Sequence, residues 1–253
     1  MGVPRRVHLV AHRGNARDCP ENTLPAFESA IELGLRFIEL DIQLSIDHVP
    51  MVIHDHDLLR TTALDGTVFE RTAADLATLS AGEPQRFGDR FAAARIPRLS
   101  DVVDLLLQHR EVTLFAEIKR ASLRQFGHET VVPRVLEVLK PLRPRCVVIS
   151  FDLAAIHMAR QLGGYPIGWV IGEYGGHERL KFEALKPEFL FCDYEKLPAA
   201  GNLWRGPWRW ALYEVVDPAI ATALVARGAD FIETMAVAPM VQAFPGMIDR
   251  HDG

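Results

Sequence analysis

The chain has 253 residues, of which 49% are hydrophobic and 24% are charged, with a formal net charge of −5. The apolar content is too high and the net charge too low for an intrinsically disordered chain. A mildly acidic balance also gives no general attraction to nucleic acid or to an anionic membrane surface.

Short apolar runs rich in β-branched residues alternate with helix-length segments along the chain. The predicted strands are His8–Arg13, Phe37–Leu44, Pro50–His54, Val112–Lys119, Cys146–Phe151, Ile167–Ile171, Phe189–Asp193, Arg209–Val215 and Asp230–Thr234. The helical patterns include Leu24–Leu33, Leu99–His109, Val131–Leu139, Leu153–Leu162 and Pro218–Arg227. This alternation is typical of a parallel sheet covered by helices.

One gap between predicted strands is too short for a parallel crossover. Only about five residues separate Leu44 from Pro50, whereas a crossover needs a dozen or more, so these strands should form an antiparallel hairpin. Setting aside the second arm of the hairpin leaves eight parallel strands. With this chain length, that count favours a distorted (β/α)8 TIM-like barrel over an open doubly wound sheet.

Residues 56–98 fit the strand–helix repeat poorly. They contain a short helical run near Ala73–Leu79 and then polar residues up to Pro97. We interpret them as a segment inserted above the barrel mouth, within a single barrel domain spanning residues 1–253. Loops at the carboxyl ends of barrel strands are where such folds build substrate pockets.

Acidic side chains occupy strand positions that should face the barrel interior. Glu39 and Asp41 alternate with aliphatic residues in the second strand, and Glu117 does so in the fourth. The aliphatic face belongs against the helices, so the carboxylates point inward. An unpaired buried carboxylate costs several kcal/mol, roughly, and needs compensation. The compensation is either an ion-pair network with Lys119 and Arg13 or a divalent cation, for which all-oxygen ligands favour Mg²⁺, Ca²⁺ or Mn²⁺ over zinc.

Two histidines accompany these carboxylates. If the hairpin turn closes over Ile46–Val49, His54 lies opposite Asp41 and shares its interior face, whereas a slip by one residue would turn it outward. His12 ends the first strand and is followed by Arg13. Histidine is the natural general acid or base near neutral pH, and arginine makes bidentate contacts with phosphate oxygens. The combination indicates phosphoryl chemistry.

Several short motifs follow one another in a fixed order. They are Ala11-His12-Arg13-Gly14, Pro20-Glu21-Asn22-Thr23 with Phe27, Ala30 and Gly34, Ile38-Glu39-Leu40-Asp41, Pro50-Met51-Val52-Ile53-His54-Asp55, Arg60-Thr61-Thr62, Ile96-Pro97-Arg98-Leu99, Glu117-Ile118-Lys119 and Ser150-Phe151. Each alone is weak, but in this order they are highly specific. The chain resembles the glycerophosphodiester phosphodiesterase family.

The resemblance implies a distorted TIM barrel that hydrolyses glycerophosphodiesters to glycerol 3-phosphate and an alcohol with a divalent metal. The nucleophile in the family is the neighbouring glycerol hydroxyl, which gives a cyclic phosphate that water then opens. Carried over residue by residue, the resemblance implies metal ligands Glu39, Asp41 and Glu117, an acid–base pair His12 and His54, phosphate-binding Arg13 and Lys119, a metal-proximal Glu21, and supporting Asn22 and Asp55.

The last third of the chain departs from the family pattern. Tyr213-Glu214-Val215-Val216 stands where the family often has Trp-Thr-Val-Asn, and Glu233-Thr234-Met235 replaces the usual closing Ile-Thr-Asp. Tyr213 is predicted to take the place of the tryptophan as an aromatic wall of the substrate pocket. Glu214 adds a negative charge to a mouth that should attract phosphate.

Two rival functions are compatible with the sequence. A lysophospholipase D or phosphatidylinositol-phospholipase-like enzyme needs an apolar surface near the mouth, which Trp204, Trp208 and Trp210 would supply. An ordinary loop with core aromatic side chains is the plainer interpretation of these tryptophans. The second rival is a non-catalytic barrel that binds phosphodiesters, because fold alone does not define function.

The cysteines and the chain's hydropathy bear on its compartment. Cys19, Cys146 and Cys192 are widely separated and form no CxxC pair, which is typical of reduced thiols. No stretch approaches the roughly 20 apolar residues that span a bilayer. We therefore predict a cytoplasmic protein with a small-molecule substrate, no nucleic-acid partner and no integral membrane segment.

Overall fold

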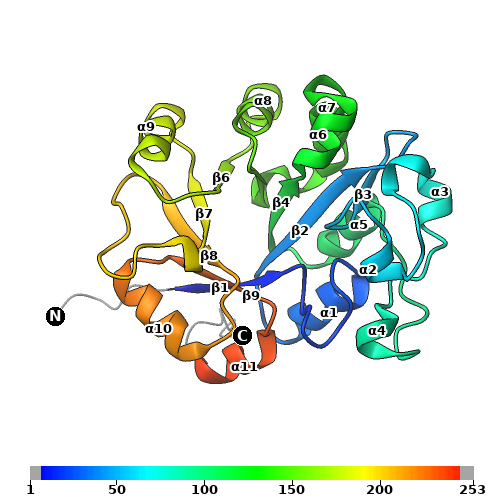
Figure 1. The fold of residues 1–253 in the computed structure, drawn as a ribbon, viewed down its shortest axis with the longest axis horizontal. Coiled ribbons are helices and arrows are strands. Elements are labelled where there is room, and N and C mark those ends of the chain that lie inside the picture. The colour runs from blue at the N-terminus through cyan, green and yellow to red at the C-terminus, as the bar shows by residue number, and fades with distance from the viewer. Residues whose placement is uncertain (1–6, 246–253) are drawn as a thin grey trace.

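The computed structural model describes residues 7–245, whose strands close into a parallel barrel surrounded by helices (Figure 1). Around the ring the described strands run β1, β2, β4, β5, β6, β7, β8 and β9, and β1 pairs with both β2 and β9 to close it. The remaining strand, β3, pairs antiparallel with the end of β2. The predicted distorted TIM-like barrel with a hairpin is confirmed. The outer ends of the predicted domain, residues 1–6 and 246–253, lie outside the described residues.

The strands and helices have the following bounds. The strands are β1 His8–His12, β2 Phe37–Leu44, β3 Pro50–Val52, β4 Thr113–Ile118, β5 Cys146–Ser150, β6 Ile167–Ile171, β7 Phe189–Asp193, β8 Arg209–Tyr213 and β9 Phe231–Thr234. The outer helices are α1 Leu24–Glu32, α5 Leu99–Gln108, α6 Arg120–Phe126, α7 His128–Leu139, α8 Leu153–Gly163, α9 Gly176–Leu185, α10 Pro218–Arg227 and α11 Val237–Ala243. The sequence patterns did not single out α6, α9 or α11. Helix α9 buries only Phe182 fully, so its apolar stripe is weak.

The barrel interior changes from apolar to polar along the strands. Its middle is filled by Val10, Phe115, Val147, Ile149, Val170, Phe191, Ala211 and Phe231. In three strands an inward phenylalanine is followed two positions later by a glutamate, the pairs being Phe37 and Glu39 in β2, Phe115 and Glu117 in β4, and Phe231 and Glu233 in β9. Since alternate strand residues share a face, these carboxylates point into the barrel near its carboxyl end.

The hairpin between β2 and β3 has a register one residue away from the predicted one. Ile53, not His54, lies opposite Asp41 and donates its N–H to the Asp41 carbonyl (3.0 Å). The turn is one residue shorter than expected, because the Ser45 N–H donates to the Val49 carbonyl (3.0 Å). Strand β3 ends at Val52, so His54 has left the ladder and reaches the central cavity through the bend that follows.

The segment after β3 packs around a small core of its own, beside the hairpin (cyan in Figure 1). It contains α2 Leu59–Thr62, the 3₁₀ turn η1 Val68–Glu70, α3 Ala73–Leu76 and α4 Pro84–Phe87. Its core consists of Met51, Ile53, Leu58, Val68, Ala73, Leu76, Ala81 and Ile96. The segment is therefore ordered by its own apolar contacts rather than by the barrel alone.

The tryptophan segment lies on the outer wall of the barrel. The described chain between β7 and β8 forms only the short 3₁₀ helix η3 Tyr194–Lys196 and an extended stretch. Trp208 and Trp210 are buried in the outer core, and Trp204 stacks on Tyr174 with ring centroids 3.7 Å apart. Trp208 and Trp210 therefore pack in the outer core of the barrel and do not form an exposed apolar surface, and Trp204 is half-buried against Tyr174. No helix in residues 7–245 is both long and apolar enough to cross a bilayer.

Candidate functional site

A cavity of about 280 Å³ opens at the carboxyl ends of the barrel strands. Its apolar lining is formed by Ile149, Phe151, Val170 and Phe191. The predicted residues among its lining are His12, Arg13, Glu39, His54, Glu117, Lys119 and Tyr213. Barrels of this kind place their functional groups at this end of the strands. The cavity is therefore the candidate functional site.

The three predicted ligand carboxylates converge. Strand pairing places Asp41 beside Glu117, and one oxygen from each of Glu39, Asp41 and Glu117 lies within 4.8 Å of the others. Oε1 of Glu39 is buried and has no hydrogen-bond partner. A buried carboxylate oxygen without a partner is costly, and oxygen ligands alone suit Mg²⁺, Ca²⁺ or Mn²⁺. These residues therefore fit a hard divalent cation.

The alternative ion-pair network exists beside this set. Asp41 lies 3.1 Å from both Lys119 Nζ and Arg13 Nε, and Lys119 is also 3.2 Å from Glu117. Burial alone would raise the pKa of Asp41, but Lys119 and Arg13 outweigh it and lower that pKa. Burial and the charge of Asp41 instead raise the pKa of Glu39 well above its ordinary value. The two cationic side chains thus compensate Asp41 but leave Glu39 in need of a cation.

The loop after β1 is wound tightly to bring Arg13 back over the barrel. Arg13 and Gly14 both have positive φ, 57° and 80°. The Arg13 N–H donates to Oε2 of Glu39 (3.1 Å). A Cβ on Gly14 would come within 2.7 Å of the carbonyl carbon of Ala26 in α1. Glycine is therefore required here both for the backbone angle and for the close approach of α1.

Glu21 and Asn22 support the site in different ways. Asn22 holds Asp41 through two hydrogen bonds, donating from Nδ2 to Oδ2 (2.8 Å) and accepting the Asp41 N–H at Oδ1 (3.2 Å). Glu21 pairs with Arg13 (3.2 Å) and with Arg60 (2.7 Å). Among the described residues Glu21 belongs to neither group of potential metal ligands. Its contacts make it a positioning group for Arg13.

The two histidines differ in their surroundings. Burial and the charge of Arg13 lower the pKa of His12 well below its ordinary value. His54 is more open, and its Nδ1 lies 2.6 Å from Oδ1 of Asp55. Asp55 also accepts a hydrogen bond from Arg60 (2.6 Å), and these two partners lower its pKa against the effect of burial. An ionised Asp55 accepts a hydrogen bond from Nδ1–H of His54, and in the neutral imidazole with this tautomer Nε2 is an acceptor.

The structure adds Glu233 and Lys196, which line the cavity and which the sequence did not assign to the site. Glu214, which the sequence placed at the mouth, also lines the cavity, with one oxygen 3.7 Å from Nδ1 of His12 and 3.8 Å from Arg13. Glu233 had a signal, since it follows an inward phenylalanine in the same alternation as Glu39. Tyr213 lines the cavity as predicted, its ring centroid 6.3 Å from that of His12.

The fold and the site define a TIM-like barrel with carboxylates, imidazoles and cationic side chains at the carboxyl ends of its strands. The model of the glycerophosphoryl diester phosphodiesterase family matches residues 12–184, and the chain belongs to this family.

Individual relatives agree with that assignment. A glycerophosphodiester phosphodiesterase of Caldanaerobacter subterraneus is 45% identical over 144 residues, covering 57% of this chain and 58% of the relative. Glycerophosphodiester phosphodiesterase 1 of Mus musculus is 37% identical over 160 residues, covering 62% of this chain and 46% of the relative. The chain thus matches about half to three fifths of these relatives' length. An Oleispira antarctica phosphodiesterase solved in complex with the product sn-glycerol-3-phosphate superposes with a TM-score of 0.83 at 25% identity, over 94% of this chain and 97% of that one.

Proposed function

We propose that the protein hydrolyses glycerophosphodiesters to glycerol 3-phosphate and an alcohol with the help of a divalent cation. The observation that carries this proposal is the cluster of Glu39, Asp41 and Glu117, of which Glu39 and Glu117 line the same cavity as His12 and His54. Membership of the family supports it, and so does the similarity to the Oleispira enzyme that was solved with its product.

The first group of proposed roles concerns binding of the cation and the substrate. Glu39, Asp41 and Glu117 would hold the cation, which when bound supplies positive charge to the phosphate oxygens in the transition state. Arg13 and Lys119 carry charged nitrogens at the same carboxylates, which places them to bind the other phosphate oxygens. Tyr213 would pack against the glycerol portion of the substrate.

Proton transfer is assigned to His12 and His54. One imidazole takes the proton of the attacking glycerol hydroxyl and the other gives a proton to the leaving alkoxide. The two exchange roles when water opens the resulting cyclic phosphate. Asp55 fixes the Nδ1–H tautomer of His54, so Nε2 is the atom that accepts or donates the transferred proton. Burial and the charge of Arg13 lower the pKa of His12, which favours the neutral imidazole that can accept a proton.

The test is hydrolysis of glycerophosphocholine by protein stripped with EDTA and then supplied with Mg²⁺, Ca²⁺ or Mn²⁺. We expect no turnover without metal and recovery with at least one cation. His12→Ala should lose about 10²- to 10⁴-fold in kcat, the usual contribution of a general acid or base. His157→Ala is the matched control, because His157 is exposed on α8 away from the cavity. Full activity in EDTA, or in His12→Ala, would contradict the proposal.

A further inference from the structure

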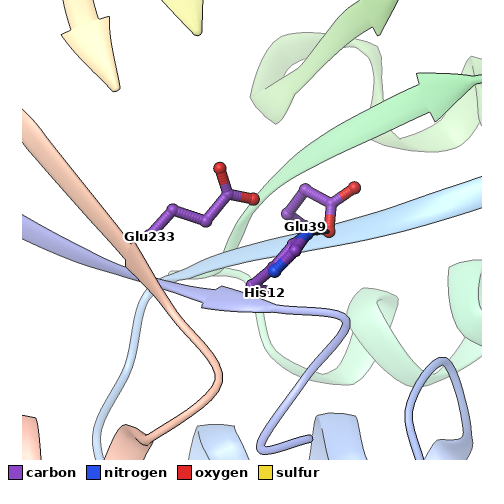
Figure 2. Close-up of side chains that lie close together, drawn as sticks. All are labelled: His12, Glu39 and Glu233. Atoms are coloured by element: carbon purple, nitrogen blue, oxygen red, sulfur yellow. Dashed lines mark ion pairs between the residues drawn. The ribbon is translucent and has the colours of Figure 1, made fainter. Parts of the chain in front are cut away.

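We propose that His12, Glu39 and Glu233 form a second cation site, adjacent to the carboxylate set and suited to a transition-metal ion such as Zn²⁺ (Figure 2). One ligand atom from each of the three side chains lies within 4.8 Å of the others, and all three residues are buried. They come from β1, β2 and β9, which are neighbours where the barrel closes.

Glu233 supplies the first independent evidence for a ligand. Its side chain is buried, with 2% of the residue exposed, and it makes no hydrogen bond or ion pair with any residue in 7–245. Figure 2 shows its carboxylate extending from β9 toward Glu39 and His12. Burial, followed by the charges of Glu117 and Asp41, raises the pKa of Glu233 well above its ordinary value. A buried carboxylate without a partner is costly, and a bound cation would stabilise it.

Unpartnered atoms on the other two residues supply further evidence. Oε1 of Glu39 and Nδ1 of His12 are buried without a hydrogen-bond partner. The closest approach between the two side chains, His12 Nε2 to Glu39 Oε2, is 3.8 Å, which is too long for a hydrogen bond. Nε2 is thus the ring nitrogen of His12 nearer to Glu39 and is the atom placed to bind a ligand between the side chains, while Nδ1 lies on the side of Glu214 (3.7 Å).

The second site differs from the carboxylate set in charge and in donor chemistry. Asp41 is compensated by Lys119 and Arg13, whereas no cationic side chain in residues 7–245 forms an ion pair with Glu233. All three members of the second site line the cavity, so an ion from solvent can reach them. An imidazole nitrogen beside two carboxylates suits Zn²⁺ and related ions, while the all-oxygen set suits Mg²⁺ or Ca²⁺. Glu39 is common to both sites, and its Oε1 has no hydrogen-bond partner whereas its Oε2 accepts the Arg13 N–H.

A consequence for turnover rests on the proposed function. His12 cannot transfer protons while its ring nitrogen binds a metal. Zn²⁺ at this site should therefore inhibit hydrolysis that Mg²⁺ supports, and inhibition should depend on Glu233, a residue outside the first carboxylate set.

The experiment is a calorimetric titration of Zn²⁺ into protein held in a large excess of Mg²⁺. We expect one equivalent of Zn²⁺ to bind to the natural sequence and to Glu117→Gln, which alters only the first set. Glu233→Gln keeps the shape of the side chain and should bind Zn²⁺ at least about tenfold more weakly. Glu173→Gln, on an exposed loop, should behave like the natural sequence. Circular dichroism of each variant establishes that it is folded.

Three outcomes would overturn the second site. They are unchanged Zn²⁺ affinity in Glu233→Gln, loss of the Zn²⁺ equivalent in Glu117→Gln, and a Mg²⁺ affinity that falls in Glu233→Gln as much as the Zn²⁺ affinity does. The last would make Glu233 a ligand of a single shared site. Because binding is measured without substrate, the result stands whether or not a glycerophosphodiester is hydrolysed. Where hydrolysis is found, the Zn²⁺ concentration for half-inhibition should rise at least about tenfold in Glu233→Gln.

Discussion

Oδ1 of Asp55 lies 2.6 Å from Nδ1 of His54, although the two residues are consecutive in the chain. The bend after β3 makes this contact possible, because neighbouring side chains on a continuing strand would point to opposite faces. Arg60 holds the second oxygen of Asp55 at 2.6 Å, so the carboxylate is fixed on both sides. Asp55 is thus placed to orient the imidazole that faces the cavity.

Replacing Asp55 tests this orienting contact. Asp55→Asn should lower kcat by about 10- to 100-fold, because an amide no longer enforces the Nδ1–H tautomer. The KM should change by much less, since Asp55 does not line the cavity. Steady-state kinetics on glycerophosphocholine separates the two parameters. Asp65→Asn, an exposed aspartate of the same segment, is the matched control, and an Asp55→Asn enzyme with natural kcat would refute the orienting role.

Gly14 provides a prediction about stability. Gly14→Ala should destabilise the fold by about 3 kcal/mol, combining the cost of an alanine at positive φ with overpacking against α1. Gly164→Ala is the matched control, because Gly164 also has positive φ (64°) but a Cβ there would meet nothing within 4 Å. It should cost only about 1 kcal/mol. Denaturant unfolding measures the free energy of unfolding of both variants. If both variants lose the same amount, contact between the added Cβ and α1 does not contribute to the destabilisation of Gly14→Ala.

The stability of the metal-free protein should depend on pH through Glu233. Because the pKa of Glu233 is raised in the folded state, the folded chain holds a proton that the unfolded chain releases above the ordinary glutamate pKa. The protonated Glu233 therefore contributes to the free energy of unfolding at low pH. This contribution decreases as pH rises, by up to about 1.4 kcal/mol per pH unit. Glu233→Gln removes this titration, so its stability relative to the natural sequence in EDTA should increase between about pH 5 and 8.

Thermal unfolding in EDTA across that pH range measures the effect. Taking the difference between variant and natural sequence cancels the titration of groups distant from Glu233, and the pKa of Glu39, which the charge of Glu233 raises, should fall in the variant. Glu173→Gln should show no change with pH relative to the natural sequence. A Glu233→Gln difference that stays constant from pH 5 to 8 would show that Glu233 is ionised in the folded protein even without metal.

Much of the fold followed from local patterns. Alternation in β2 and β4 correctly turned Glu39, Asp41 and Glu117 inward, and the short gap after Leu44 correctly predicted a hairpin. The register of that hairpin was wrong by one residue, because turn length depends on backbone angles that composition does not reveal. His54 nonetheless reaches the cavity, through an irregular bend rather than through strand alternation.

Other features depend on contacts between distant parts of the chain. Arg60 and Glu83 reach Glu21 from the segment after β3, with Glu83 accepting the Glu21 N–H at 2.6 Å. No local pattern links residues so far apart, and a buried glutamate such as Glu83 has no periodic signal of its own. The position of Glu233, by contrast, could have been predicted from a local pattern, since the Phe231–Glu233 spacing repeats that of Phe37–Glu39. Applying strand alternation to β9 would have placed it inside the barrel.

The tryptophan side chains packed on the outside of the barrel near β7 and β8 also determine what the protein's intrinsic fluorescence reports. All four tryptophans of the sequence, Trp169 on β6, Trp204 and Trp208 in the extended segment and Trp210 on β8, lie in this sector, and none lines the central cavity. Tyr174 and Phe182 pack among them. Tryptophan fluorescence should therefore report the packing of one side of the barrel. A ligand in the cavity would touch no tryptophan side chain and should not change the emission by direct contact. The same spectrum makes unfolding of this sector visible separately from events at the carboxylates across the barrel.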